Sequence, residues 1–113
     1  MTMVAKKDGK VLIDAIEVPD TVFGRMKGLL GRRSLGRGKA MLLSPCSSIH
    51  TFGMQFSLDL VFLDRTMRIT SLSEKVPPNR VEWGGVAARS VLELETGWLE
   101  MASLREGDQL DLS

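Results

Sequence analysis

Short runs of apolar and β-branched residues, separated by turn-forming residues, predict a chain made mainly of β-strands. Residues 58–63 are apolar on both faces, as in a strand that is covered on both sides. Residues 91–95 alternate between apolar and acidic side chains, which is typical of a strand with one exposed face. The predicted strands are residues 11–18, 40–43, 58–63, 67–72, 91–95 and 108–112. A tight turn at Arg65 and Thr66 joins two of them into a hairpin.

Helical spacing of apolar residues is limited to two short segments. After a capping residue at Asp20 or Thr21, an apolar stripe predicts a helix over residues 22–30. Residues 96–105 can form a second short helix, which Gly107 ends. The pattern as a whole predicts a mainly β protein, a small sandwich or barrel-like single domain with one or two short helices.

Composition places this chain among water-soluble globular proteins. Its 113 residues suffice for one domain, residues 1–113, and 43% of them are hydrophobic while 26% are charged. The formal net charge of +1 gives no reason to expect nucleic acid or an anionic membrane as a partner. No apolar run approaches the roughly 20 residues of a membrane helix. The first residues lack the apolar core of a signal peptide, so we expect a cytoplasmic protein.

The charges are unevenly distributed along the chain. Residues 21–58 contain six basic residues and no acidic residue, whereas residues 91–113 contain six acidic residues and only Arg105 as a base. Two solvated faces are the favoured interpretation of this asymmetry. The alternatives are attraction of an anionic ligand and self-association into a homo-oligomer.

Residues 45–64 hold the best candidates for chemistry, because they include the only cysteine, Cys46, the only histidine, His50, and the acidic residue Asp59. A single cysteine excludes an internal disulfide. A closed structural zinc site needs four ligands of the Cys or His type, and the chain has two such residues, so we predict no metal and no cofactor. A mixed site with Asp59 or Glu93, or one shared across a dimer, is the alternative.

A cysteine–histidine nucleophile is the most specific enzymatic hypothesis, since a neighbouring imidazole lowers the pKa of a thiol. On a helix, Cys46 and His50 would be close neighbours; on a strand they would lie about 13 Å apart at ~3.3 Å per residue. Asp59 would orient the imidazole. The favoured interpretation is a buried cysteine and a hydrogen-bonded histidine, because cysteine is among the most buried residue types.

Asp59 lies within an apolar strand, so we expect it to be buried and therefore paired or hydrogen-bonded. The partners predicted for it are Arg25, His50 or backbone amides near Thr51. A perturbed carboxylate in a cleft would mark a functional site.

The basic, glycine-rich residues 28–39 have the glycine spacing of a phosphate-binding loop. They lack its lysine, because Arg37 stands there, and Ala40 follows Lys39 where a hydroxyl would hold magnesium. Nucleotide hydrolysis is therefore rejected. A looser anion site using Arg25 and Arg32 is an alternative to a plain basic surface loop.

Five ordered blocks resemble an uncharacterised prokaryotic family known as domain of unknown function 192. The blocks are Met26–Arg32, Ile49–Met54, Leu58–Asp64, Val91–Leu94 and Gly107–Asp108. The resemblance covers about residues 10–112 and implies a small, mainly β, sandwich- or barrel-like fold with no established activity. Ser57 stands where many relatives have proline, and the turn at Arg65 and Thr66 lacks their glycine. Many relatives also carry an export signal that is not recognised here.

We expect a small non-catalytic domain that binds a polar or anionic ligand, or a protein partner. Its predicted ligand-binding residues are His50, Thr51, Met54, Asp59, Arg25 and Glu93. The alternatives are a hydrolase or transferase that depends on Cys46 and His50, with Asp59 as a third catalytic candidate, and a structural accessory subunit. The binding hypothesis requires His50 and Asp59 to meet beside an opening.

Overall fold

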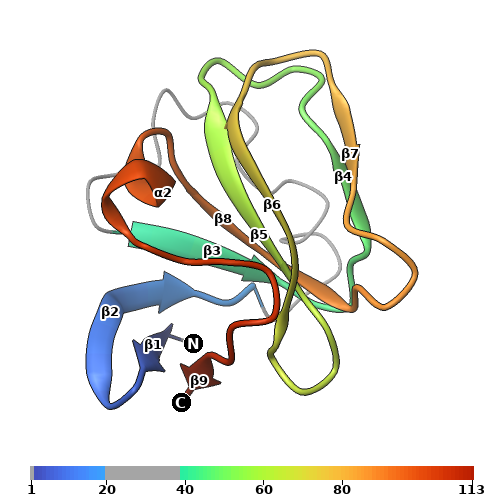
Figure 1. Ribbon diagram of the computed structural model, residues 1–113. Helices are drawn as coiled ribbons and strands as arrows, with labels where there is room; N and C mark the ends of the chain where they lie inside the picture. Colours follow the sequence, from blue (N-terminus) through green and yellow to red (C-terminus); the bar gives the residue numbers. More distant parts are fainter. Residues whose placement is uncertain (1, 20–38) are drawn as a thin grey trace.

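The computed structural model describes residues 2–19 and 39–113, and β-strands make up most of this part of the chain (Figure 1). The described strands are β1 (Thr2–Lys7), β2 (Lys10–Glu17), β3 (Lys39–Leu43), β4 (Ser48–His50), β5 (Leu58–Leu63), β6 (Ile69–Val76), β7 (Val81–Trp83), β8 (Ser90–Glu95) and β9 (Asp111–Leu112). The described helix is α2 (Trp98–Met101).

Seven strands form one mixed sheet in the order β6-β5-β8-β3-β2-β1-β9. Only β2 and β3 are parallel neighbours, and the other pairs are antiparallel. The predicted hairpin is β5 and β6, with Val61 opposite Leu72. All six residues of β5 are buried, which confirms the prediction of a strand covered on both faces.

The two ends of this sheet approach each other without closing. The amide of Ile69 donates to the carbonyl of Asp108 at 2.8 Å, and the amide of Leu110 donates to the carbonyl of Met67 at 3.0 Å. One isolated bridge, between Arg68 and Gln109, takes the place of a ladder there. The predicted mainly β fold is confirmed, and the sheet is open rather than a barrel.

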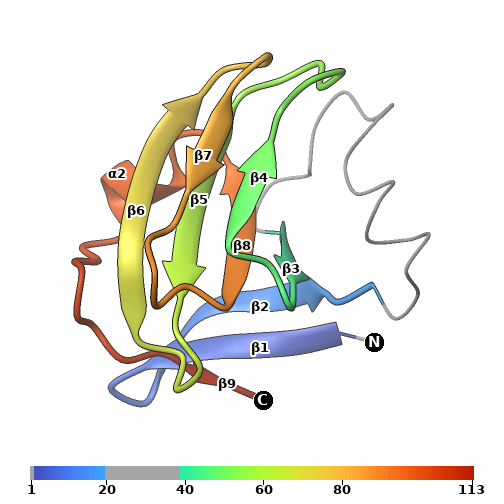
Figure 2. The same ribbon diagram turned by 90° about the vertical axis from the view of Figure 1, so that its right-hand side faces the viewer.

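A second, two-stranded sheet of β4 and β7 covers one face of β5 and β8, and α2 lies on the opposite side (Figures 1 and 2). Because side chains alternate along a strand, β5 contributes to two apolar clusters. Val61 and Leu63 pack in the cluster that includes Leu99 of α2, whereas Leu60 and Phe62 pack in the cluster beside β4. These two faces decide which candidate residues can meet.

Several elements differ from the sequence prediction. β1, which ends with Lys6 and Lys7, was not predicted. It pairs with β2 on one side and with β9 on the other. β7 lies within residues 76–85, which the pattern left as a long connection. The helix predicted over residues 96–105 is one turn long, because the chain is already extended at Ala102. The helix predicted over residues 22–30 lies outside the described residues.

Candidate functional site

Asp59 is a structural residue in this fold. Its side chain is fully buried on β5, on the face that α2 covers. One carboxylate oxygen accepts a 2.9 Å hydrogen bond from the amide of Lys75, and the other accepts one of 2.8 Å from the amide of Leu99. The prediction that a buried Asp59 must be hydrogen-bonded is correct, but the donors are these amides rather than His50 or amides near Thr51.

His50 lies on the other side of β5. It is exposed on β4, where it is paired with Val81, and its ring stacks on Phe52 with 5.4 Å between the ring centroids. The structure therefore does not bring His50 and Asp59 together. The physical reason is the two-residue period of β5, which turns Asp59 away from the cluster beside β4.

Thr51 and Met54 lie close together but serve the packing of the β4–β7 sheet. Thr51 is fully buried; its hydroxyl donates to the carbonyl of Pro77 at 2.7 Å and accepts from the amide of Arg80 at 2.8 Å. The amide of Met54 donates to the carbonyl of Thr51 at 3.2 Å, and its half-buried side chain packs beside Leu60 and Phe62.

Cys46 lies among bends between β3 and β4, so the helical turn that would place its thiol beside His50 does not form. The thiol donates to the carbonyl of Ser48 at 3.1 Å, and the side chain is partly exposed. Arg25 and Arg32, proposed for anion binding, lie outside the described residues.

Glu93 is a buried carboxyl group in the middle of the main sheet. It lies on β8 between Met41 of β3 and Leu60 of β5, and only 5% of the residue is exposed. This burial raises the pKa of Glu93 from 4.5 to about 7, because the charged form is deprived of water. Because Glu93 pairs with Leu60, it lies on the face of the sheet opposite Asp59, and its part in a ligand site stays a prediction.

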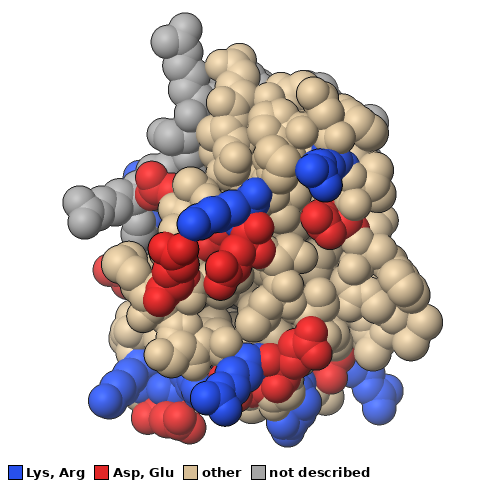
Figure 3. Space-filling view, turned by 45° about the horizontal axis from the view of Figure 1, so that its top comes forward, with Lys and Arg blue, Asp and Glu red and all other residues tan. Residues whose placement is uncertain are grey.

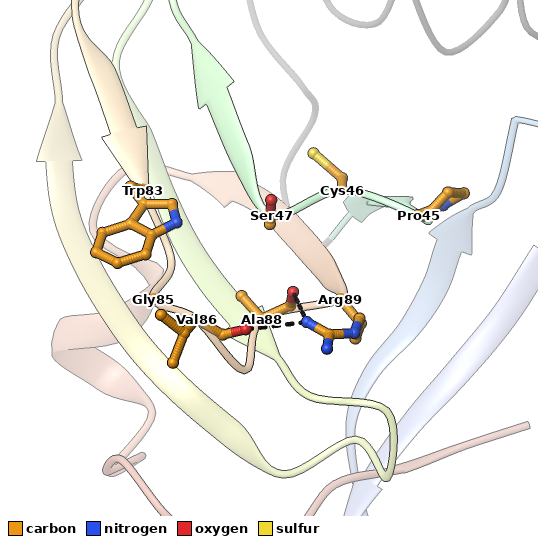
Figure 4. A pocket seen from close by; sticks show the side chains of 8 residues that line it. All are labelled: Pro45, Cys46, Ser47, Trp83, Gly85, Val86, Ala88 and Arg89. Atoms are coloured by element: carbon orange, nitrogen blue, oxygen red, sulfur yellow. Dashed lines mark hydrogen bonds between the residues drawn. The ribbon is translucent and has the colours of Figure 1, made fainter.

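A cleft of about 300 Å³ opens between the segment before β4 and the loop after β7. We call it the Trp83–Arg89 cleft. Its lining residues are Pro45, Cys46, Ser47, Trp83, Gly85, Val86, Ala88 and Arg89 (Figure 4). Trp83 and Arg89 lie on opposite sides of it in Figure 4, with Ser47 and Ala88 between them. The cleft is open to solvent, since Trp83 is 63% and Val86 is 84% exposed.

Close backbone packing holds the loop beside this cleft. Gly84 sits on the ring of Phe62, where an added Cβ would lie 2.3 Å from a ring carbon. The amide of Gly84 donates to the carbonyl of Ser47, and the amide of Arg89 donates to the carbonyl of Leu63 at 2.7 Å. The next glycine, Gly85, has a φ of 99°, which favours glycine. The backbone at Trp83 and at Arg89 is therefore held in place on both sides of the loop.

Arg89 provides the positive charge of the cleft. One terminal nitrogen of its guanidinium donates to the carbonyls of Val86 at 3.1 Å and Ala88 at 2.9 Å. These bonds hold the group in place, and among the described residues its other N–H groups form no hydrogen bond. Within residues 2–19 and 39–113, no carboxylate forms a salt bridge with Arg89. A guanidinium without a carboxylate partner can bind the carboxylate or phosphate of a ligand.

Figure 3 shows Lys and Arg side chains interspersed with Asp and Glu on the face that it presents. Two of the ion pairs are Lys75–Glu100 at 2.8 Å and Lys7–Asp108 at 3.1 Å. In the described part of the chain, no three Cys, His, Asp or Glu residues are grouped as metal ligands would be. No helix there is long and apolar enough to cross a membrane.

Sequence reasoning identified one wall of the cleft and missed the other. Cys46 was a candidate because of its chemistry, but Trp83 and Arg89 were not among the candidate residues. The available signal was the pair Gly84 and Gly85 directly after a tryptophan in a long connection. Such glycines often mark a close backbone approach, as Gly84 does against Phe62.

Comparisons with known proteins place this geometry in a family without an assigned activity. The family model DUF192, described as "Uncharacterized ACR", matches residues 3–112. A protein of Thermococcus sibiricus named UPF0127 protein is 28% identical over 114 residues, which cover 96% of this chain and 73% of that protein.

Two crystal structures share the fold. A protein of unknown function from Novosphingobium aromaticivorans has a TM-score of 0.83 and 18% identity, over 98% of this chain and 84% of that one. A suggested transcription regulator from Sinorhizobium meliloti has a TM-score of 0.77 and 19% identity, over 96% and 90%. At these identities the likeness concerns the fold alone. The family match spans nearly the whole sequence, and it confirms the resemblance that the motifs indicated: the chain belongs to the DUF192 family.

Proposed function

We propose that this protein is a non-catalytic binding domain and that the Trp83–Arg89 cleft takes a small anionic molecule. The observation that carries the proposal is the guanidinium of Arg89, which is fixed by two carbonyls beside a concave surface and forms no described salt bridge. Arginine binds carboxylate and phosphate through a planar fork of donors, and a preset plane reduces the entropy lost on binding.

The proposal keeps the anionic ligand expected from the sequence and moves its site. The predicted contacts were His50, Thr51, Met54, Asp59, Arg25 and Glu93. Of these, Asp59 and Thr51 use their polar atoms within the fold. Cys46 is the predicted residue that also lines the cleft. Its position supports the use of the thiol as a reporter of local charge.

The first test measures anion binding directly. Small carboxylates and phosphates are titrated into ¹⁵N-labelled protein, and chemical-shift changes of residues 45–47 and 83–89 report binding in the cleft. We expect at least one anion to bind there and Arg89→Gln to weaken it about tenfold. Arg65→Gln, which removes an exposed arginine from the β5–β6 turn, is the matched control. The proposal fails when no anion shifts these residues, or when both variants behave like the native protein.

The second test uses the single thiol. An anionic alkylating agent, iodoacetate, is compared with neutral iodoacetamide for its rate of reaction with Cys46. Positive charge at Arg89 should raise the ratio of the iodoacetate rate to the iodoacetamide rate above the ratio for free cysteine. Arg89→Gln should lower this ratio to the value for free cysteine. An unchanged ratio in the variant argues against an anion-attracting cleft.

A further inference from the structure

The cleft pairs a flat aromatic surface with a fixed cation, and this pairing defines a ligand class. Trp83 has 63% of its surface exposed on the outer face of the small sheet. Arg89 is on the opposite side of the cleft in Figure 4, and its guanidinium plane is set by its bonds to Val86 and Ala88. A ligand in the cleft would contact Trp83 and Arg89 with different parts of its structure.

Trp83 is held outward by its strand. It lies opposite Ser48 in the β4–β7 pair, and it shares the exposed face of that sheet with His50 and Val81. The next residue, Gly84, is fixed against Phe62, so the indole cannot turn into the core without moving this contact. An exposed indole on a rigid strand offers its π-face to a ring, which prefers offset stacking or an edge-to-face arrangement.

The size of the cleft limits what can fill it. About 300 Å³ holds on the order of ten non-hydrogen atoms, since a water molecule occupies about 30 Å³ in the liquid. One six-membered ring with a carboxylate has about this size. A nucleotide has about twice as many atoms, so a large part of it would lie outside the cleft in solvent.

A second polar side chain, Ser47, supports the binding of a carboxylate beside Arg89. Ser47 lines the cleft between Trp83 and Arg89, and its carbonyl is already used by the amide of Gly84. The hydroxyl of Ser47 is a separate donor, which would serve one carboxylate oxygen while the guanidinium of Arg89 serves the other. Val86, which is 84% exposed, supplies apolar surface at the cleft.

We propose that the ligand of the Trp83–Arg89 cleft is a small aromatic carboxylic acid, whose ring stacks on Trp83 while its carboxylate binds Arg89 and Ser47. This inference rests on the proposed function, because it specifies the anion that the cleft takes. It requires both the ring and the charge to contribute to affinity. Neither an aliphatic acid nor an uncharged aromatic amide meets both requirements.

The experiment compares three probes of nearly equal size. Benzoate has the ring and the charge, cyclohexanecarboxylate has the charge without the flat ring, and benzamide has the ring without the charge. Dissociation constants are measured by chemical-shift titration of the full chain. We expect benzoate to bind at least fivefold more tightly than either of the others.

Two variants assign the two contributions. Trp83→Leu should remove the preference for benzoate over cyclohexanecarboxylate, and Trp83→Phe should keep it. Arg89→Gln should remove the preference over benzamide. Because both residues are exposed, we expect each variant to fold. A dispersed NMR spectrum of each variant verifies this.

The outcomes separate this inference from the function on which it rests. If cyclohexanecarboxylate binds as tightly as benzoate and Trp83→Leu has no effect, the aromatic class is wrong while an anion-binding cleft stands. If benzoate does not bind but other anions do, the class is again wrong. If no anion binds in the cleft, the proposed function fails as well.

Discussion

The amide of Cys46 donates a hydrogen bond of 2.8 Å to the carbonyl of Arg89, which joins the two sides of the Trp83–Arg89 cleft. Cys46 leads into β4, and Arg89 leads into β8, so this bond fixes the small sheet to the main one. The guanidinium of Arg89 is bound to its own loop at the same point. A ligand in the cleft would therefore contact β7 at Trp83 and the segments that lead into β4 and β8.

Asp59 should be essential for stability rather than for binding. Asp59→Asn replaces one acceptor oxygen by an NH₂ donor that faces the amide of Lys75 or Leu99. Because the group is fully buried, we expect the free energy of unfolding to fall by about 3 kcal/mol, as for lost hydrogen bonds to a charged group. Urea unfolding measures this loss. Asp14→Asn, at an exposed position of β2, is the control, and equal losses in the two variants would contradict the assignment.

Thr51 should stabilise the β4–β7 sheet through its hydroxyl. Thr51→Val preserves the shape but leaves the carbonyl of Pro77 and the amide of Arg80 without this partner. We expect a loss of about 2 kcal/mol in the free energy of unfolding, the cost of unsatisfied buried groups. Thr51→Ser keeps the hydroxyl and should lose less. A valine variant as stable as the serine variant would disprove the role of these bonds.

Glu93 should make stability depend on pH near neutrality. Its pKa is about 7 in the folded protein and near 4.5 in the unfolded chain, so between these values the folded state binds one more proton. The contribution is fully present below pH 4.5 and is lost as the pH rises through 7. A shift of this size corresponds to about 3 kcal/mol.

Glu93→Gln imitates the protonated form and should remove this dependence. The variant should match the native protein near pH 4.5 and be the more stable of the two at pH 8, by up to about 3 kcal/mol. Thermal or urea unfolding across this range measures the difference. Glu95→Gln, two residues further along β8 and less buried, is the control. A constant difference at all pH values would be inconsistent with a buried titrating carboxyl group.

Gly84 should tolerate no side chain, because a Cβ would lie 2.3 Å from the ring of Phe62. We expect Gly84→Ala to lower the free energy of unfolding by about 2 kcal/mol, as overpacking does. Phe62→Leu in the same chain should relieve part of this loss, and a double-mutant cycle measures the coupling. Additive effects would show that the two residues do not compete for space.

The sequence determined the strands that have a strong apolar pattern. Residues 58–63 and 91–95 correspond to β5 and β8, the buried strands at the centre of the main sheet. β1 and β7 were not predicted, because both lie at positions where pairing with neighbours decides the conformation. The motif blocks also identified the family, since they depend on residue order and not on geometry.

The tertiary structure decided which side chains meet. Asp59 and His50 are nine residues apart, and the sequence could not tell that β5 directs the first toward α2 while β4 directs the second to solvent. The cleft combines Cys46 with Trp83 and Arg89, which lie about forty residues away in the sequence. The physical reason is that a local pattern specifies which face of a strand is apolar, whereas strand pairing and layer packing determine what lies opposite that face.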